Sequence, residues 1–354
     1  MKAPFEWDSF SDQPKVIRDA AFKRSMRMSY LSDFLKMTMT SLVIFPFAII
    51  HMTLRSKIKA ADVKLSDFVG IGVNLDKGES QFDLVDELGI EHVLIRVPLW
   101  EIDKLSAYEK FALEFKRRKK SVLINILQDR EHIESCETLE NDMRKVFQTF
   151  NGIASEYQIG NAINRIKWGF FSIKEYLKFF GIVQKIRDTE FPSYRLIGPG
   201  VIDFEYHFTI RALFNCYPIN FDNLSSLLYV DRVGAPSNRQ YGFFDTDRKL
   251  RLLASIVKFS SKVKNKDIYI TEVNWPLKGT SPYAPTSETE CVSPRDYKRY
   301  MVEYLKIALE SSVVRRVYWH QLIAPGYGLI DNRHNQLRKT EGFYALKSLL
   351  SNSG

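Results

Sequence analysis

The chain has few cysteines, and none has the spacing of a metal site. Its 354 residues contain three, Cys136, Cys216 and Cys291, which are far apart and odd in number. A zinc site would need closely paired cysteines, and a disulfide framework would need an even set. The histidines are likewise scattered without ligand spacing. We therefore predict reduced thiols, no metal and no cofactor.

A nucleic-acid-binding motif is also missing, although the formal net charge is +9. The 51 lysines and arginines are spread along the chain and accompany no recognition motif. We therefore expect no nucleic acid partner. A negatively charged membrane surface, or an anionic sugar or phosphate ligand, explains the charge at least as well.

No break in composition divides the main part of the chain, and hydrophobic residues make up 45% of it. That share supports a packed core and argues against disorder. The length allows one large α/β barrel or two ordinary domains. We predict one catalytic-type domain over residues 61–354, preceded by a basic and apolar helical extension over residues 1–60.

The extension begins as a basic segment and continues as an apolar one. Basic and large apolar side chains are mixed through residues 1–36, as in a helix that lies on an anionic bilayer. Met37 to Leu54 is uncharged and barely long enough to span a bilayer, and Pro46 and His51 weaken a span. No cleavage site of a signal peptide follows. Three arrangements stay open: a helix buried on the barrel, a helix attached to the membrane interface, and a true span.

We expect peripheral membrane contact through residues 15–59. The unpaired cysteines fit the cytoplasmic face of the inner membrane. A spanning N-terminus with its basic flank inside would instead place the barrel outside.

From Phe68 onward, short apolar runs alternate with segments that carry apolar residues at helical spacing. Such an order, repeated eight times, predicts a (β/α)8 TIM barrel. The runs are Phe68–Asn74, His92–Pro98, Ser121–Asp129, Tyr157–Asn164, Tyr194–Asp203, Leu224–Arg232, Ile268–Asn274 and Arg316–Leu322. The helical segments include Ser106–Lys120, Ser172–Arg187, Lys249–Lys264 and Pro294–Ser311.

One carboxylate stands at the end of the seventh run. Glu272 lies in DIYITEVNW, where near-alternating apolar residues predict a buried strand. α/β proteins place their chemistry at such C-terminal strand ends, so Glu272 is the predicted nucleophile. A partner carboxylate is expected at the end of the fourth run, in YQIGNAINR, but Ala162 stands there.

Taken in order, these motifs resemble the clan A glycoside hydrolases. These retaining (β/α)8 enzymes have an acid/base glutamate at the end of strand four and a nucleophilic glutamate at the end of strand seven. The resemblance covers about Phe68 to Leu350. It rests on Arg96 in LIRVPLW, on GNAIN where the family has Asn-Glu, on Glu272 and on Trp319 in RVYWHQL.

The resemblance implies a role for each matched residue. Asn161 would hydrogen-bond the sugar 2-hydroxyl, and Arg96 would hold Glu272 and keep it ionised. Tyr229 would hydrogen-bond the nucleophile, and Trp319 and Trp275 would offer an apolar face to a sugar ring. Further polar residues at or beyond strand ends are expected to line the same mouth: Asp129, Arg130, Asp203, Glu205, Asp231 and Arg232.

The same residues also have structural interpretations. A strand-end glutamate beside an arginine can be an ion pair of the scaffold. Trp319 can belong to the core, and Tyr229 can simply pack.

Ala162 cannot transfer a proton, and loss of a general acid slows a reaction about 10²- to 10⁴-fold. The chain is then an engineered inactive variant, a natural pseudoenzyme that binds a glycan, or an enzyme whose leaving group needs no proton. A sugar phosphate, nucleotide sugar or lipid-linked sugar diphosphate would suit the last alternative, with Arg130, Arg232 and Arg239 facing the anionic donor.

We predict a carbohydrate-active, retaining glycosidase-like protein with Glu272 as nucleophile. Its expected substrate is an oligosaccharide or glycolipid, in the assembly or trimming of a cell-surface polysaccharide or lipopolysaccharide.

Overall fold

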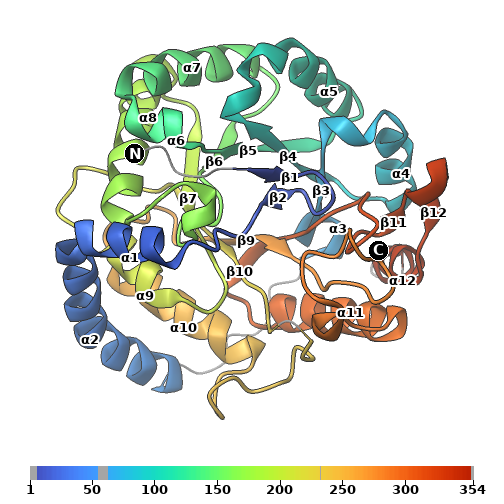
Figure 1. Cartoon of the computed structure of the whole chain (residues 1–354). Helices are drawn as coiled ribbons and strands as arrows, with labels where there is room; N and C mark the ends of the chain where they lie inside the picture. The colour runs from blue at the N-terminus through green and yellow to red at the C-terminus, as the bar shows by residue number, and fades with distance from the viewer. Residues whose placement is uncertain (1–5, 55–62, 232, 352–354) are drawn as a thin grey trace.

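Eight parallel strands close into a barrel in the computed structural model, which describes residues 6–54, 63–231 and 233–351. Every apolar run singled out in the sequence forms one of these strands, so the predicted (β/α)8 barrel is confirmed (Figure 1). The strands are β3 (Val69–Val73), β4 (His92–Pro98), β5 (Ser121–Leu127), β6 (Glu156–Ile159), β7 (Arg195–Ile202), β8 (Asn223–Leu227), β9 (Ile268–Val273) and β10 (Val314–Trp319).

The strands are apolar because the barrel buries both of their faces. β3 and β9 contain no exposed residue, as parallel strands covered by helices require. Inside the barrel, Leu94, Leu123, Ile197, Tyr269 and Tyr318 form a packed layer. The barrel centre is therefore core, and a ligand has to bind at one of its ends.

Helices alternate with the strands and form an outer ring (Figure 1). Ser135, Ser172, Asp245 and Ser293 each accept a hydrogen bond from a backbone N–H of the helix they precede, which fixes where those helices begin. The ring consists of α4 (Ser80–Leu88), α5 (Leu105–Arg117), α7 (Cys136–Thr149), α8 (Ile173–Glu190), α9 (Tyr206–Leu213), α10 (Thr246–Phe259), α11 (Pro294–Glu310) and α12 (Glu341–Ser351). Shorter elements are α3 (Leu65–Phe68), α6 (Arg130–Glu134), η1 (Leu75–Lys77), η2 (Leu99–Lys104), η3 (Ile166–Trp168), η4 (Glu288–Glu290), η5 (Arg333–Asn335), and the ribbon of β11 (Ile330–Asp331) and β12 (Arg338–Lys339).

The N-terminal extension contains a hairpin as well as helices. β1 (Trp7–Asp8) and β2 (Gln13–Pro14) pair antiparallel, and the hairpin lies over the barrel (Figure 1). α1 (Ala20–Ser29) and α2 (Leu31–Leu54) follow, and α2 lies along the outside of α9 and α10. The helical character expected for residues 1–36 was thus wrong at the hairpin, whose two-residue strands carry no periodic signal.

One face of α2 is buried on the barrel. Met37, Ser41, Ala48 and Met52 recur on that face and are buried. By length and composition α2 could cross a membrane, with a mean hydropathy of 1.7, yet its opposite face is exposed. Of the three arrangements left open by the sequence, a helix buried on the barrel therefore describes only the inner face of α2. Residues 55–59, which were included in the predicted membrane segment, lie outside the described part of the chain.

Candidate active site

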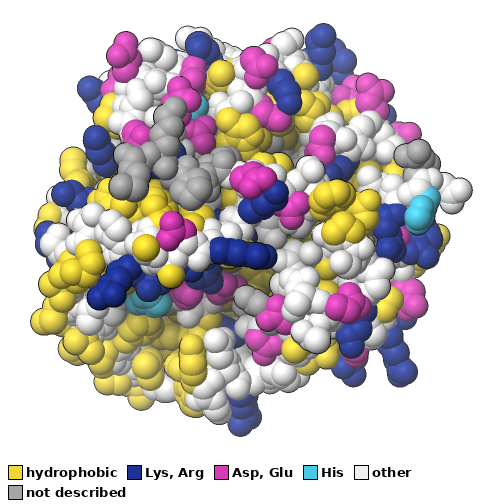
Figure 2. Space-filling model, viewed as in Figure 1, with side chains coloured by type: hydrophobic (Ala, Val, Ile, Leu, Met, Phe, Trp, Pro, Cys, Tyr) yellow, Lys and Arg dark blue, Asp and Glu magenta, His cyan; other side chains and the backbone are white. Residues whose placement is uncertain are grey.

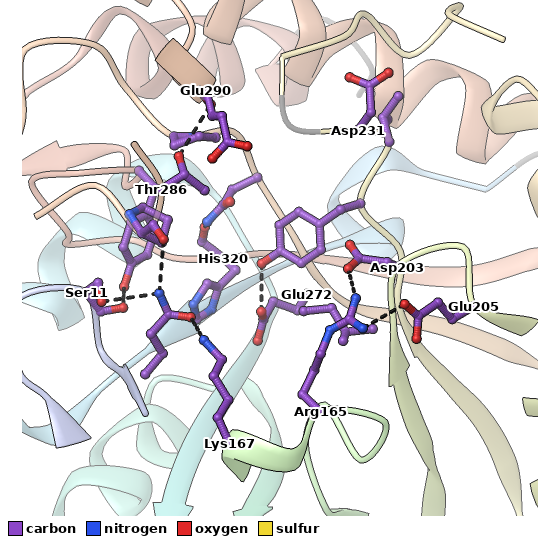
Figure 3. A pocket seen from close by; sticks show the side chains of 18 of the residues that line it. Ser11, Arg165, Lys167, Asp203, Glu205, Asp231, Glu272, Thr286, Glu290 and His320 are labelled. Carbon is purple, nitrogen blue, oxygen red and sulfur yellow. Dashed lines mark hydrogen bonds and ion pairs between the residues drawn. The ribbon is translucent and has the colours of Figure 1, made fainter. Parts of the chain in front are cut away.

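A pocket of about 680 Å³ opens where the barrel strands end. Its wall comes from the C-terminal ends of β4, β7, β9 and β10, from the loops after β6 and β8, and from the N-terminal hairpin (Figure 3). TIM barrels carry their chemistry at this end. The ionisable residues that line it are Asp12, Arg96, Arg165, Lys167, Asp203, Glu205, Tyr229, Asp231, Tyr241, Glu272, Glu290, His320 and Tyr327.

Glu272 lies near the end of β9 and is 9% exposed, in the pocket. Tyr229, which follows β8, donates its hydroxyl to Glu272 Oε1 at 2.6 Å (Figure 3). The hydrogen bond predicted between these residues is confirmed. Burial and the negative charge of Glu272 raise the pKa of Tyr229 well above its ordinary value, so the phenol keeps its proton and stays a donor.

His320 lines the pocket directly after β10. Its ring stacks on Tyr327 with a centroid distance of 5.5 Å. Burial lowers the pKa of His320 against the opposing charge of Glu272, so the imidazole is neutral. A neutral histidine beside a carboxylate can donate one hydrogen bond and accept another. The sequence analysis found no role for it, although it follows Trp319 directly.

Arg96 does not pair with Glu272, contrary to prediction. Its Nη2 donates instead to the backbone carbonyl of Asp12 at 2.9 Å. The guanidinium lies over the rings of Trp7 and Trp168, at 5.6 and 5.7 Å from their centroids. Its Nε has no hydrogen-bond partner among the described residues. Arg96 thus faces the pocket but is held by the N-terminal hairpin.

Asn161 and Ala162 lie behind the pocket wall. The side chain of Asn161 accepts hydrogen bonds from Asn125 and Gln158, and its own amide nitrogen is unpartnered within the described structure. Ala162 is fully buried in an apolar cluster with Leu127, Trp168 and Leu227. Hydrophobic side chains therefore surround the position at which the sequence analysis expected an acid/base residue. Neither residue lines the pocket, so contact of Asn161 with a sugar stays a prediction.

The two tryptophans are core residues. Trp275 and Trp319 are 1% and 0% exposed and stack on each other. Trp319 donates its indole N–H to the Tyr297 hydroxyl of α11, and Trp275 donates to the carbonyl of Gly234. They point away from the pocket because successive strand residues face opposite sides of the barrel wall. The prediction that they face a sugar was wrong for this conformation.

Asp203, Glu205 and Asp231 line the pocket as predicted. Arg165, in the loop after β6, forms ion pairs with Asp203 and Glu205, the latter at 2.7 Å (Figure 3). Arg165 lies in the same GNAINR stretch as Ala162, but the sequence analysis did not select it. Its partners Asp203 and Glu205 lie far from it in the sequence, so no local pattern pairs them.

Asp129 and Arg130 do not reach the pocket, and their predicted role there was wrong. Asp129 caps α6 and bonds His132 Nδ1 at 2.9 Å. Arg130 pairs with Glu134 and Glu175 at 2.7 and 3.0 Å. Both side chains therefore stabilise α6 and its contacts with neighbouring helices. Arg232, also predicted at the mouth, lies outside the described residues, and the exposed Arg239 is not part of the pocket lining.

The N-terminal hairpin, which the sequence analysis missed, forms one wall of the pocket. The Asp12 carboxylate accepts from Gln321 Nε2 at 3.0 Å and pairs with Lys77 at 3.1 Å. The Tyr327 hydroxyl donates to the carbonyl of Ser11, and Lys167 donates to the side chain of Gln13. These contacts join residues separated by more than 60 positions in the sequence, so no local sequence pattern predicts them.

Negative charge predominates in the pocket. Six carboxylates line it, against the three cationic side chains of Arg96, Arg165 and Lys167. Arg165 is neutralised by two of those carboxylates. The excess favours neutral or cationic ligands over anionic ones.

No protein-family model matches this sequence, and no curated protein is similar to it. Solved structures are similar in fold. The virulence factor SghA of Agrobacterium tumefaciens superposes with a TM-score of 0.59 at 10% identity, over 81% of this chain and 97% of that one. A GH39 enzyme of Xanthomonas axonopodis gives 0.58 at 12% identity, over 84% and 68%. The GH53 catalytic domain of Ignisphaera aggregans gives 0.57 at 13% identity, over 83% and 99%.

The similar structures include clan A glycoside hydrolases of families GH39 and GH53, and this chain shares their closed eight-stranded barrel fold. Counted from β3, strand four of that fold is β6 and strand seven is β9. Glu272 therefore lies near the end of strand seven and Ala162 just after strand four, where the sequence analysis expected a nucleophile and an acid/base residue. At these identities the likeness establishes the fold and leaves activity to experiment.

Proposed function

We propose that the protein is a carbohydrate-active, retaining glycosidase-like protein in which Glu272 attacks the anomeric carbon of a sugar. The observation that carries this is the Glu272–Tyr229 hydrogen bond of 2.6 Å inside the mouth pocket. A buried phenol that donates to a carboxylate fixes which oxygen is free to attack. A protein that only binds glycans has no need of this arrangement.

The substrate has to supply a leaving group that departs without a proton. Ala162 offers none, and the apolar side chains around it leave no polar surroundings for a replacement acid. Asp203 and Glu205 are both held in ion pairs with Arg165, so their carboxylates already have a partner. A weakly basic leaving group, such as a phenolate, meets the requirement.

The acidic pocket argues against a phosphate-leaving donor. The arginines expected to hold such a donor are ion-paired outside the pocket, not part of its lining, or outside the described residues. A phosphate would face six carboxylates and three cations. We therefore favour a neutral glycoside over a nucleotide sugar or lipid-linked diphosphate. The role in assembly or trimming of a cell-surface glycan remains part of the proposal.

Binding without chemistry is the second candidate. It is favoured by Ala162 and by the hairpin, which holds Arg96 through Asp12 and occupies part of the mouth. In that case the pocket would hold the end of a glycan, and Glu272 would accept hydrogen bonds from its hydroxyls.

Intact-protein mass spectrometry after incubation with 2-fluoro sugars that carry dinitrophenyl leaving groups separates the two candidates. We expect a covalent adduct, mapped by peptide analysis to Glu272, in the wild type and in Glu290→Gln, whose carboxylate lines the same pocket. Glu272→Gln should form none. A wild type that binds the sugars without forming an adduct would be a glycan-binding pseudoenzyme.

A further inference from the structure

α2 buries a mixed face on the barrel and turns a largely apolar face outward. Asp33 and Ser41 are buried together with the apolar Met37, Ala48 and Met52, and His51 is half-buried against Ser255. A helix on the surface of a water-soluble protein instead turns a mainly polar face outward. The outward side of α2 is therefore matched to an apolar medium.

We call this side the outer face of α2. Its large apolar side chains are 46% to 78% exposed: Leu31, Leu35, Met39, Leu42, Val43, Phe47, Ile50 and Leu54. No Asp, Glu, Lys or Arg occurs in α2 after Lys36. Figure 2 shows hydrophobic side chains gathered along the edge of the molecule over α2. Phe259 of α10, 45% exposed, lies against His51 and extends the patch. A continuous apolar face of this size on a soluble protein marks an interaction site.

The three threonine hydroxyl groups of α2 are already hydrogen-bonded within the helix. Thr38, Thr40 and Thr53 donate to carbonyls one turn earlier, at 3.0, 2.7 and 2.8 Å. Moving these threonines out of water would therefore leave none of their hydroxyl donors unpaired, which removes the main cost of placing threonine in an apolar medium.

α2 is fixed to the barrel at both ends. Near its start, Asp33 pairs with Arg211 of α9 at 2.7 Å, and both side chains are at most 7% exposed. Near its end, His51 bonds Ser255 at 2.9 Å, and Arg251 donates to the carbonyl of Met52. A transmembrane orientation would break the Asp33–Arg211 pair and leave a buried charge without a partner. Only the outer face is free to meet a bilayer.

Positive charge surrounds the start of this face. Arg24 and Arg27 of α1 and Lys36 of α2 are exposed. Between residues 15 and 54 the acidic residues are Asp19, which caps α1, and the buried Asp33. Basic side chains beside an apolar helix face complement anionic lipid headgroups.

From these observations we infer that the outer face of α2 docks in the interface of an anionic lipid bilayer, parallel to the membrane plane. Leu42, Phe47 and Ile50 enter the acyl boundary, and Arg24, Arg27 and Lys36 lie among the headgroups. α2 lies on the side of the barrel, and α1 links it to the hairpin (Figure 1). Because the hairpin forms one wall of the pocket, this orientation would place the mouth beside the membrane. The docking itself does not depend on the proposed function; the access of the mouth to membrane-bound glycans does.

Flotation of the full chain with vesicles tests the docking. We expect binding to vesicles of phosphatidylglycerol mixed with phosphatidylcholine and weaker binding to phosphatidylcholine alone. L42Q/F47Q/I50Q should lower affinity roughly 100-fold, since three exposed side chains lose their burial in lipid. R24Q/R27Q/K36Q should lower affinity for the anionic vesicles roughly 100-fold and weaken its dependence on salt.

L337Q/Y344Q is the matched control, because these exposed apolar residues lie beside β12 and in α12, on the opposite side of the barrel from α2 (Figure 1). It should float like the wild type, and circular dichroism should show that every variant is folded. A wild type that stays in solution at all lipid concentrations would overturn the proposal. So would a wild type that is dimeric without lipid while L42Q/F47Q/I50Q is monomeric, since the outer face would then be an interface between copies. Neither readout depends on activity, so the proposed function is judged separately.

Discussion

At the scale of single residues, the proposed chemistry depends on the pair of Tyr229 and Glu272. Their hydrogen bond joins the ends of β8 and β9 at 2.6 Å. A hydrogen bond to a charged group contributes about 1.5–3 kcal/mol. Tyr229→Phe keeps the ring and removes this bond. We expect the adduct on Glu272 to form roughly 10- to 100-fold more slowly, measured as the rate of mass increase with 2-fluoro sugars.

Tyr304→Phe is the control for this substitution. Tyr304 is fully buried and donates to the carbonyl of Leu228, outside the pocket. It should change stability by about 1 kcal/mol and leave the labelling rate unchanged. Equal rates in the wild type and Tyr229→Phe would mean that this hydrogen bond has no part in catalysis.

Substitutions at Ala162 test whether the expected acid/base position differs from that of a working hydrolase only by the missing carboxyl side chain. It has a φ of 45° and is fully buried among apolar residues. Ala162→Glu forces a carboxyl group into that cluster, and we expect a loss of about 2–4 kcal/mol in urea unfolding and no hydrolysis of unactivated glycosides. Ala162→Gly, which relieves the positive φ, should stay within about 1 kcal/mol of the wild type. Wild-type stability combined with new hydrolysis in Ala162→Glu would instead indicate an inactivated hydrolase.

At the scale of elements, one buried ion pair holds α2 on α9. Asp33→Asn leaves Arg211 buried without its counter-charge, which costs about 3–5 kcal/mol. We expect the urea midpoint of unfolding to fall accordingly. Protease cleavage within α2 should increase, because the helix would be released from α9. Glu341→Gln, which breaks the exposed pair with Lys298, should change stability by less than about 1 kcal/mol. Equal effects of the two substitutions would show that the Asp33 pair does not hold the helix.

A histidine joins α6 to α7. Burial alone would lower the pKa of His132, but its hydrogen bonds and charge contacts with Asp129 and Asp142 outweigh burial and raise it. A raised pKa means that the protonated ring stabilises the fold fully below the unfolded value of about 6.5, and that this contribution is lost as pH rises through the folded pKa. The difference in unfolding free energy between wild type and His132→Gln should therefore be largest in acid and shrink above that value. A difference that grows with pH would contradict the assignment.

At the scale of the whole molecule, the extension behaves as part of the barrel. α2 covers apolar surface of α9 and α10, and the hairpin closes one side of the mouth. A chain that begins at Leu65 should therefore aggregate or unfold at a lower urea concentration, whereas the full chain should unfold in one transition. A soluble shortened barrel with an unchanged midpoint would show that residues 1–60 are a separate unit.

Several features of this molecule follow from the sequence alone. The alternation of apolar runs and helical segments determined the barrel, because each strand must be apolar on both faces wherever it pairs. The position of Glu272 followed from the same pattern, since a residue at the C-terminal end of a barrel strand lies at the mouth regardless of loop length and conformation. The bond from Tyr229 was predictable because both residues end neighbouring strands.

Other features were decided only by tertiary structure. Arg96 has its partner in the hairpin, 84 positions away, and nothing local distinguishes that partner from Glu272. Asp129 and Arg130 also follow a strand, but α6 begins there and turns them toward other helices. Strand register decides whether Trp275 and Trp319 point into the barrel or outward. A shift of one residue in the register would reverse their direction. Periodicity fixes elements because it is a local property, whereas the partner of a charge or an apolar face depends on which distant segment the fold brings against it.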